Sequence, residues 1–207
     1  MGQVSGKLIA IEGVDGCGKS TLAANLSQKL TDVGRSVVLT REPGDSSIGP
    51  EIRQIVNHHK EAICAKAEFL LYAADRAQHI NQLVLPALQD EKIVISDRMA
   101  DSSLVYQGYG RGLSLDMIET VNKWAMNDLR PDLTIYLRID VRVALERIQK
   151  TRNQITRFDV ETMAFWQRVV DGFEEIYANR DDVLILDATQ TQEVLVNLAF
   201  GRVNKII

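Results

Sequence analysis

The sequence has little of what marks several protein classes. Its 207 residues contain two cysteines, Cys17 and Cys64, whose spacing suits no zinc site and whose scarcity indicates a reducing compartment. Basic residues do not predominate, because 28 acidic against 24 basic side chains give a net charge of −4, the wrong sign for a general nucleic-acid binder. No apolar run approaches the roughly 20 residues that span a bilayer. We therefore expect a cytoplasmic protein with no nucleic-acid or membrane partner.

What is present fits a globular chain. Apolar residues make up 45% and charged residues 25%, close to the globular average. A chain of this length buries roughly 70% of the surface that it exposes when unfolded, so it needs no disulfide or metal to fold. We expect one domain over residues 1–207.

Five short apolar runs rich in Val and Ile predict strands, at residues 8–11, 37–40, 93–96, 133–137 and 183–186. The runs are continuous rather than alternating, which is typical of strands buried on both faces of a parallel sheet. Segments with helical periodicity separate them, at residues 19–33, 65–89 with a division at Pro86, 115–129, 141–149, 159–179 and 192–204. The order predicts an α/β fold, a five-stranded parallel sheet flanked by helices on both faces.

A glycine-rich loop joins the first expected strand to the first expected helix. Residues 13–20 match the phosphate loop G-x-x-x-x-G-K-[ST] without a mismatch. Glycine lets the backbone approach phosphate, and the helix N-terminus aims free N–H groups at it. The loop predicts the P-loop NTPase fold with a bound nucleoside triphosphate and Mg²⁺, Lys19 neutralising the β and γ phosphates and the Ser20 hydroxyl binding the metal. The expected nucleotide-binding residues are Gly13, Val14, Asp15, Gly16, Cys17, Gly18, Lys19, Ser20 and Thr21.

Asp97 follows the third expected strand, at the carboxyl edge where ligands bind in α/β proteins. We expect Asp97 to be a second Mg²⁺ ligand, directly or through water; the alternative is a carboxylate that caps or pairs with the neighbouring loop. Among P-loop proteins, switch GTPases carry an Asn-Lys-x-Asp element, and residues 122–125 (NKWA) lack its acid. Arg41, Arg76 and Arg98 instead suggest a second anionic substrate, although each alone also fits a surface or ion-paired arginine.

Several motifs together resemble the thymidylate kinase family. They are EGVDGCGKST at residues 12–21, REPG at 41–44, ADRAQH at 74–79, DR at 97–98 and YQG at 106–108, in the family's order. The resemblance implies transfer of the γ-phosphoryl group of Mg·ATP to dTMP, giving dTDP and ADP in dTTP synthesis. It also implies a homodimer and a cis peptide bond before Pro43.

The resemblance also implies roles for single residues. Asp15 corresponds to the carboxylate that holds the sugar 3′-hydroxyl, Arg98 and Arg41 to the pair that grips the acceptor phosphate, and Arg76 to the arginine that reads thymine O4. Tyr72 stands where the family usually has a stacking Phe, although a tyrosine at helical spacing also fits plain core. The pocket-lining segment contains Ser102, Ser103, Tyr106 and Gln107. The chain departs from the family at Asp45, Ser46, Met99 and Tyr72, so the resemblance does not extend to the shape of the pocket or to its discrimination between thymine and uracil.

Some family members place a catalytic arginine in the phosphate loop, where this chain has Gly16, and others supply arginines from a lid. A lid is expected here at about residues 147–158, with Arg152 and Arg157 ahead of Arg147. Spaced five apart, the three arginines converge only through an irregular segment. The competing interpretation is a solvated basic loop. The expected catalytic residues are Lys19, Arg98, Arg152, Arg157 and Asp15.

Two other functions remain open from the sequence. One is a kinase for a different nucleoside monophosphate or a deoxynucleoside on the same fold. The other is a nucleotide-binding module or switch without catalysis.

Overall fold

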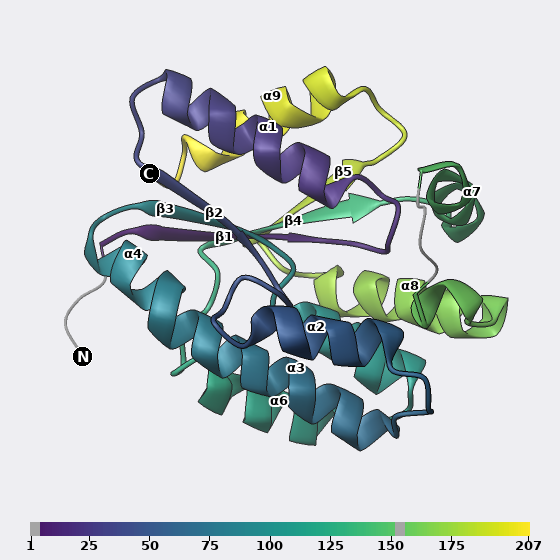
Figure 1. Ribbon diagram of the computed structural model, residues 1–207. Helices are drawn as coiled ribbons and strands as arrows, with labels where there is room; N and C mark the ends of the chain where they lie inside the picture. The colour runs from purple at the N-terminus through teal and green to yellow at the C-terminus, as the bar shows by residue number, and fades with distance from the viewer. Residues whose placement is uncertain (1–4, 152–155) are drawn as a thin grey trace.

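A computed structural model describes residues 5–151 and 156–207 of the chain. Its centre is a five-stranded sheet in the order β2-β3-β1-β4-β5, in which every neighbouring pair is parallel (Figure 1). The strands are β1 (Lys7–Glu12), β2 (Val37–Arg41), β3 (Ile93–Asp97), β4 (Leu133–Arg138) and β5 (Val183–Asp187). The sequence prediction of a five-stranded parallel sheet is confirmed.

Helices cover both faces of this sheet (Figure 1). α1 (Lys19–Asp32) and α9 (Gln192–Val203) pack together on one face. The opposite side carries α2 (Gly49–His58), α3 (Ala65–His79), α4 (Leu85–Gln89), α6 (Leu115–Ala125) and α8 (Met163–Tyr177). A short α5 (Ala100–Ser103) follows β3, and α7 (Val141–Thr151) lies beside the carboxyl end of β4. Among the described residues, no helix has the length and apolar character to cross a membrane.

The central strand shows why the apolar runs are continuous. Ile9 and Ile11 of β1 belong to one buried cluster, which includes the α1 leucines Leu22, Leu26 and Leu30. The intervening Leu8 and Ala10 belong to a second buried cluster on the other face, with side chains of α4. Because both faces are covered by helices, alternation of polar and apolar residues disappears.

The long helical segment divides just before the expected position. α3 runs into a π-helical stretch, Ile80–Val84, and α4 then begins one residue before Pro86. Proline lacks a backbone N–H and collides with the carbonyl four residues earlier, so the widened turns precede it and Pro86 itself sits in the first turn of α4.

Two segments differ from the prediction in ways that affect the site. α2 was not expected, because the residues before it are rich in Gly, Pro, Asp and Ser and read as a loop. The helix expected at 159–179 begins later: Phe158–Val160 form a 3-10 turn, and the Thr162 hydroxyl accepts the Phe165 N–H to cap α8.

Candidate active site

The phosphate loop lies between β1 and α1, as its sequence predicts. Gly18, at the N-terminus of α1, has φ +102°, in the left-handed region that glycine adopts without strain. The buried Lys19 ammonium folds back and donates to the Val14 carbonyl at 3.0 Å. The lysine is therefore held inside the loop, next to where the helix N-terminus attracts phosphate.

Ser20 and Asp97 meet at the ends of adjacent elements. The Ser20 hydroxyl donates to Asp97 Oδ2 at 2.5 Å. Hydroxyl and carboxylate oxygens suit Mg²⁺, which keeps several water or phosphate ligands and needs few from the protein. Within residues 5–151 and 156–207 no three His, Cys, Asp or Glu side chains gather as a fuller metal site. The pair thus fits a Mg²⁺ that is shared with a nucleotide.

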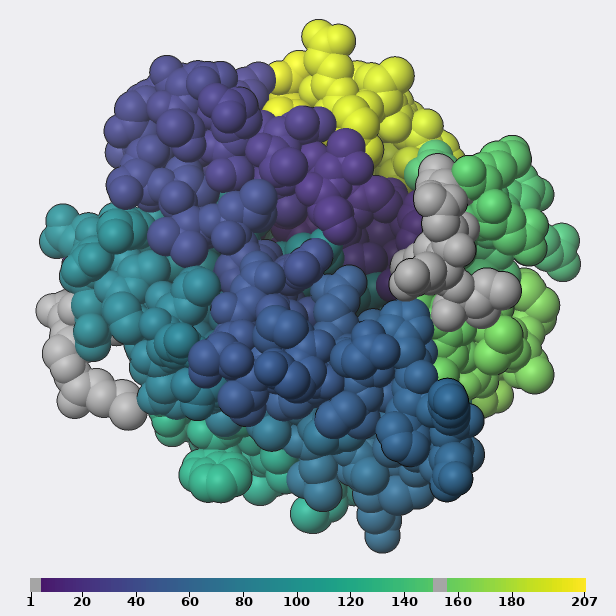
Figure 2. Space-filling model, in the orientation of Figure 1, coloured from purple at the N-terminus to yellow at the C-terminus, as the bar shows by residue number. Residues whose placement is uncertain are grey.

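A cavity of about 790 Å³ opens beside the phosphate loop. Figure 2 shows a hollow between the purple atoms of the N-terminal elements and the dark blue atoms of α2. A volume of this size suits a nucleotide-sized ligand. The cavity is lined by every residue that the resemblance assigned to the acceptor: Asp15, Arg41, Tyr72, Arg76, Arg98, Ser102, Ser103, Tyr106 and Gln107.

Arg98 forms part of this cavity wall. Its backbone has φ +74°, a left-handed conformation that is unusual for a residue with a side chain. The guanidinium donates to the Gly13 carbonyl and the Ser102 hydroxyl, both at 3.0 Å, and pairs with Asp15. It also lies over the Tyr106 ring at 5.0 Å. The phosphate loop and the expected acceptor site are thus joined by one side chain.

Arg76 is buried, with 2% of its surface exposed, and is held by protein acceptors. Its Nε donates to Glu42 at 2.8 Å, and its terminal nitrogens donate to Asn122, Ser103 and the Met99 carbonyl. If Arg76 contacts a base, its N–H groups must be shared between the base and these protein acceptors.

Glu42 anchors Arg76 from the end of β2. Its second oxygen contacts His79 Nδ1 at 2.9 Å, so His79 lies behind the site. Burial alone would raise the pKa of Glu42, but Arg76 and the hydrogen bond to His79 outweigh it and hold that pKa below its ordinary value. The peptide bond that follows, Glu42–Pro43, is cis, as expected.

Arg53 is a cavity-lining residue that the sequence analysis missed. It lies on α2 and donates to the Pro43 carbonyl at 2.9 Å. Burial and the nearby charge of Arg41 lower its pKa. The signal in the sequence was Pro50 in a first helical turn with Ile52 and Val56 at helical spacing, a pattern too short to stand out.

The two lid arginines that the structure describes, Arg147 and Arg157, lie in different places. Arg147 lines the cavity and donates to the Ala188 carbonyl at 3.1 Å. Arg157 lies at the loop between α2 and α3, where its guanidinium donates to the Ile63 carbonyl at 3.3 Å. Arg152 lies outside the described residues. A Cβ on Gly16 would stand 2.4 Å from the Ala144 carbonyl of α7, so the phosphate loop has no room for an arginine there.

A buried strand, a phosphate loop, a helix N-terminus and an acid on the adjacent strand define a P-loop nucleotide-binding protein of the α/β class. The adjoining arginine-lined cavity adds room for a second anionic ligand. The thymidylate kinase family model matches residues 11–199, and the chain belongs to the thymidylate kinase family.

Relatives with the same name cover nearly the whole chain. The thymidylate kinase of Halothermothrix orenii is 44% identical to it over 190 residues, which are 91% of each chain. That of Bacillus cytotoxicus is 42% identical over 197 residues, covering 93% of this chain and 94% of its own. The thymidylate kinase of Clavibacter sepedonicus is 41% identical over 205 residues, or 99% and 97%.

Glu12, the last residue of β1, is fully buried behind Arg98. Its carboxylate accepts the Met99 N–H at 2.8 Å and the Ser102 hydroxyl at 2.6 Å, while Ser102 accepts from Arg98. Burial raises the pKa of Glu12 from 4.5 to about 7, against the opposing charge of Arg98.

Glu12→Gln should therefore change how stability depends on pH. Between pH 4.5 and about 7 the folded chain keeps a proton that the unfolded chain has released, so the contribution of Glu12 to stability is lost as the pH rises through that window. We expect the unfolding free energy of the variant, relative to wild type, to rise by up to about 3 kcal/mol from pH 4.5 to 8. Urea unfolding at a series of pH values measures it. Glu119→Gln, at an exposed position, is the control, and parallel curves for Glu12→Gln and wild type would refute the argument.

Proposed function

We propose that the protein transfers the γ-phosphoryl group of ATP to dTMP, giving dTDP and ADP, in the synthesis of dTTP. The observation that carries this proposal, beside family membership, is that one cavity contains both the phosphate loop and the Arg98 cluster. A donor triphosphate on the loop and an acceptor phosphate at the arginines would then meet end to end.

In phosphoryl transfer the protein positions two phosphates and neutralises the charge that spreads over the transferring group. Lys19 and the loop amides bind the donor, and Ser20 and Asp97 hold Mg²⁺. When bound, the ion draws charge from the phosphate oxygens. Arg98 grips the acceptor phosphate together with Arg41 and Arg53, which line the same cavity.

The remaining residues orient the acceptor nucleoside and close the site. Asp15 takes the sugar 3′-hydroxyl, Tyr72 stacks on the base, and Arg76 reads its edge. The segment 147–158 acts as a lid that excludes water, the competing phosphoryl acceptor, and it brings Arg152 and Arg157 to the reacting phosphates. The position of Arg157 at the loop between α2 and α3 is compatible with a lid that still has to close.

We further propose that residues 1–207 act as a single P-loop kinase domain and that the protein is cytoplasmic. Its cysteines, buried Cys17 and exposed Cys64, are both free thiols, as a reducing compartment maintains them. We also propose a homodimer. Its support is the surface of α3 and α6, where Leu70, Met117 and Trp124 expose 57%, 62% and 81% of their area.

A panel of acceptors with Mg·ATP tests the proposed reaction. We expect dTMP to be converted to dTDP far faster than AMP, UMP or a free nucleoside. Lys19→Ala should lower turnover about 100-fold or more, because it removes a donor that stabilises developing charge. A preference for AMP, UMP or a nucleoside, or ATP binding without any diphosphate product, would refute the proposal.

Arg53→Met should weaken the acceptor site selectively. Loss of one charged hydrogen bond to phosphate costs about 1.5–3 kcal/mol, so we expect the KM for dTMP to rise about 10- to 100-fold with the KM for ATP little changed. Steady-state kinetics with each substrate varied in turn measure it. Arg130→Met, at an exposed position outside the cavity lining, is the matched control. An unchanged KM for dTMP would remove Arg53 from the acceptor site.

Trp124→Glu tests the dimer surface. A charge at the most exposed of the three apolar side chains should disfavour its burial against a second copy. Sedimentation equilibrium of wild type should give twice the chain mass, and the variant should shift toward the monomer. Leu198→Glu on α9, 51% exposed in the native residue, should stay dimeric. A monomeric wild type would contradict the homodimer.

A further inference from the structure

Three side chains spaced four apart form a row along α3: Glu68, Tyr72 and Arg76. Tyr72 and Arg76 line the acceptor cavity. Glu68 is buried, with 1% of its surface exposed, and lies one helical turn before the tyrosine. Neither the sequence motifs nor the proposed reaction uses this buried acid.

Glu68 holds the amide of the cavity residue Gln107. Gln107 Nε2 donates to Glu68 Oε1 at 3.0 Å. An ionised carboxylate only accepts hydrogen bonds, so Gln107 must present its NH₂ group, and never its carbonyl, to Glu68. No described residue donates to the side-chain carbonyl of Gln107, and Gln107 lines the cavity. That carbonyl is left to accept a hydrogen bond from a ligand.

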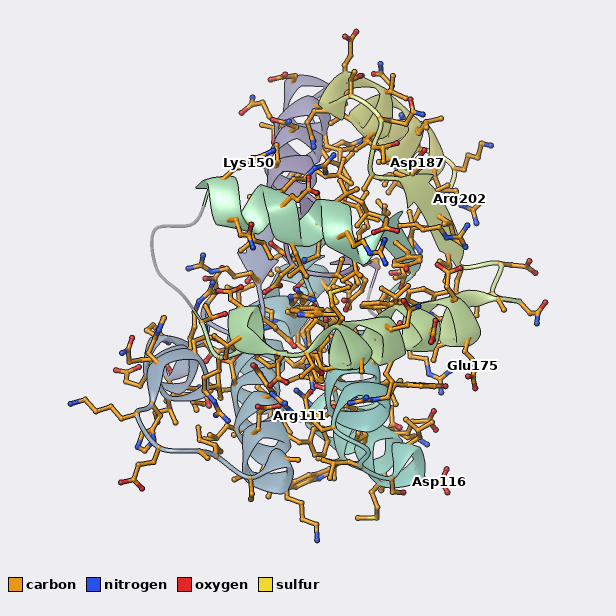
Figure 3. All side chains as sticks on the ribbon, turned by 90° about the vertical axis from the view of Figure 1, so that its right-hand side faces the viewer. Arg111, Asp116, Lys150, Glu175, Asp187 and Arg202 are labelled. Atoms are coloured by element: carbon orange, nitrogen blue, oxygen red, sulfur yellow. The ribbon has the colours of Figure 1, made fainter. Side chains whose placement is uncertain are left out.

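Arg111 locks Glu68 in this arrangement. Its guanidinium donates to Glu68 Oε1 at 3.2 Å and Oε2 at 3.3 Å, and pairs with Glu161 at 2.5 Å. It also lies over the rings of Phe158 and Phe165, at 5.3 and 4.8 Å. In Figure 3, Arg111 lies between α8 above it and the helices α3 and α6 below it. Both oxygens of Glu68 are therefore committed, and within the part of the chain that the structure describes their side-chain partners are Gln107 and Arg111.

We propose that Glu68 is a positioning residue that fixes the polarity of the Gln107 amide, and that this polarity selects bases whose ring N3 carries hydrogen. This inference rests on the proposed function, because it concerns the base of the monophosphate acceptor. Thymine and uracil present an N3–H donor and a carbonyl O4, which match the Gln107 carbonyl and the Arg76 N–H groups. Cytosine presents a bare N3 acceptor and an N4 amino donor, which oppose both.

The row along α3 thus supplies one group that would contact the base, Arg76, and holds the other, Gln107, in place. Arg76 lies one helical turn beyond Tyr72, and Gln107 is held by Glu68 one turn before it. A base stacked on Tyr72 would have its polar edge between Arg76 and Gln107. The arrangement separates keto from amino pyrimidines and leaves thymine and uracil equivalent, because they differ only at C5.

Glu68→Gln tests the inference. The amide that replaces the carboxylate both donates and accepts, so Gln107 becomes able to turn over and offer N–H to a cytosine N3. We expect the ratio of kcat/KM for dTMP to kcat/KM for dCMP to fall at least about 10-fold, the discrimination that one mispaired buried polar group provides. The ratio of kcat/KM for dTMP to kcat/KM for dUMP should stay unchanged. A general distortion of the pocket would be expected to change both ratios.

Glu161→Gln is the matched control, because it changes the other acid partner of Arg111 and leaves Gln107 and Glu68 in contact. Its dTMP to dCMP ratio should equal that of wild type. Glu68→Met, which removes the acceptor altogether, should lower the ratio in the same direction as Glu68→Gln. Melting curves establish that each variant is folded.

An unchanged dTMP to dCMP ratio in folded Glu68→Gln and Glu68→Met would overturn the inference. So would failure of both variants to fold, which would assign Glu68 to the fold instead. A wild-type protein that phosphorylates no dTMP would refute the proposed function itself. An enzyme that prefers dTMP to dCMP equally well with and without Glu68 would refute only the inference.

Discussion

Parallel pairing of the three strands β2, β3 and β1 is the constraint on which the site depends. Asp97 is in register with Ile11 on one side and with Arg41 on the other, so three chain segments end at one edge. The pairing brings together the segments that leave these strands: the phosphate loop after β1, the cis-proline segment after β2 and Arg98 after β3. A register slip in any one strand would separate the donor side of the cavity from the acceptor side.

Buried acids support two arginines that line the cavity, Arg76 and Arg98, and also Arg111, which lies outside its lining. Glu12 lies behind Arg98 through Ser102, Glu42 binds Arg76 directly, and Glu68 binds Arg111. Burying a carboxylate is costly unless its oxygens are satisfied, and each of these acids accepts at least two hydrogen bonds. These hydrogen bonds fix the side chains before a ligand arrives. Binding therefore loses less conformational entropy.

Local chemistry made much of this molecule predictable. Continuous apolar runs gave the strands, and glycine spacing gave the phosphate loop, because each property is encoded within a few neighbouring residues. Arg53 was missed because α2 is short and begins among turn-forming residues, so packing of Ile52 and Val56 decides its structure more than propensity does. The contact between Glu68 and Gln107 joins residues 39 positions apart, and no local pattern reports such a pairing.

The acceptor side of the cavity works by exchange of partners. The chain carries a net charge of −4, yet Arg41, Arg53 and Arg98 converge on one cavity, where Asp45, the Pro43 carbonyl and Asp15 pair with them. A phosphate entering this space replaces or joins contacts that already exist, so each arginine contributes only the difference between old and new partners. Electrostatic attraction therefore brings a monophosphate to the site without favouring any base. Choice among bases then depends on the row along α3, where donors and acceptors have fixed directions. Because different residues provide phosphate affinity and base selectivity, a substitution can alter one property without the other.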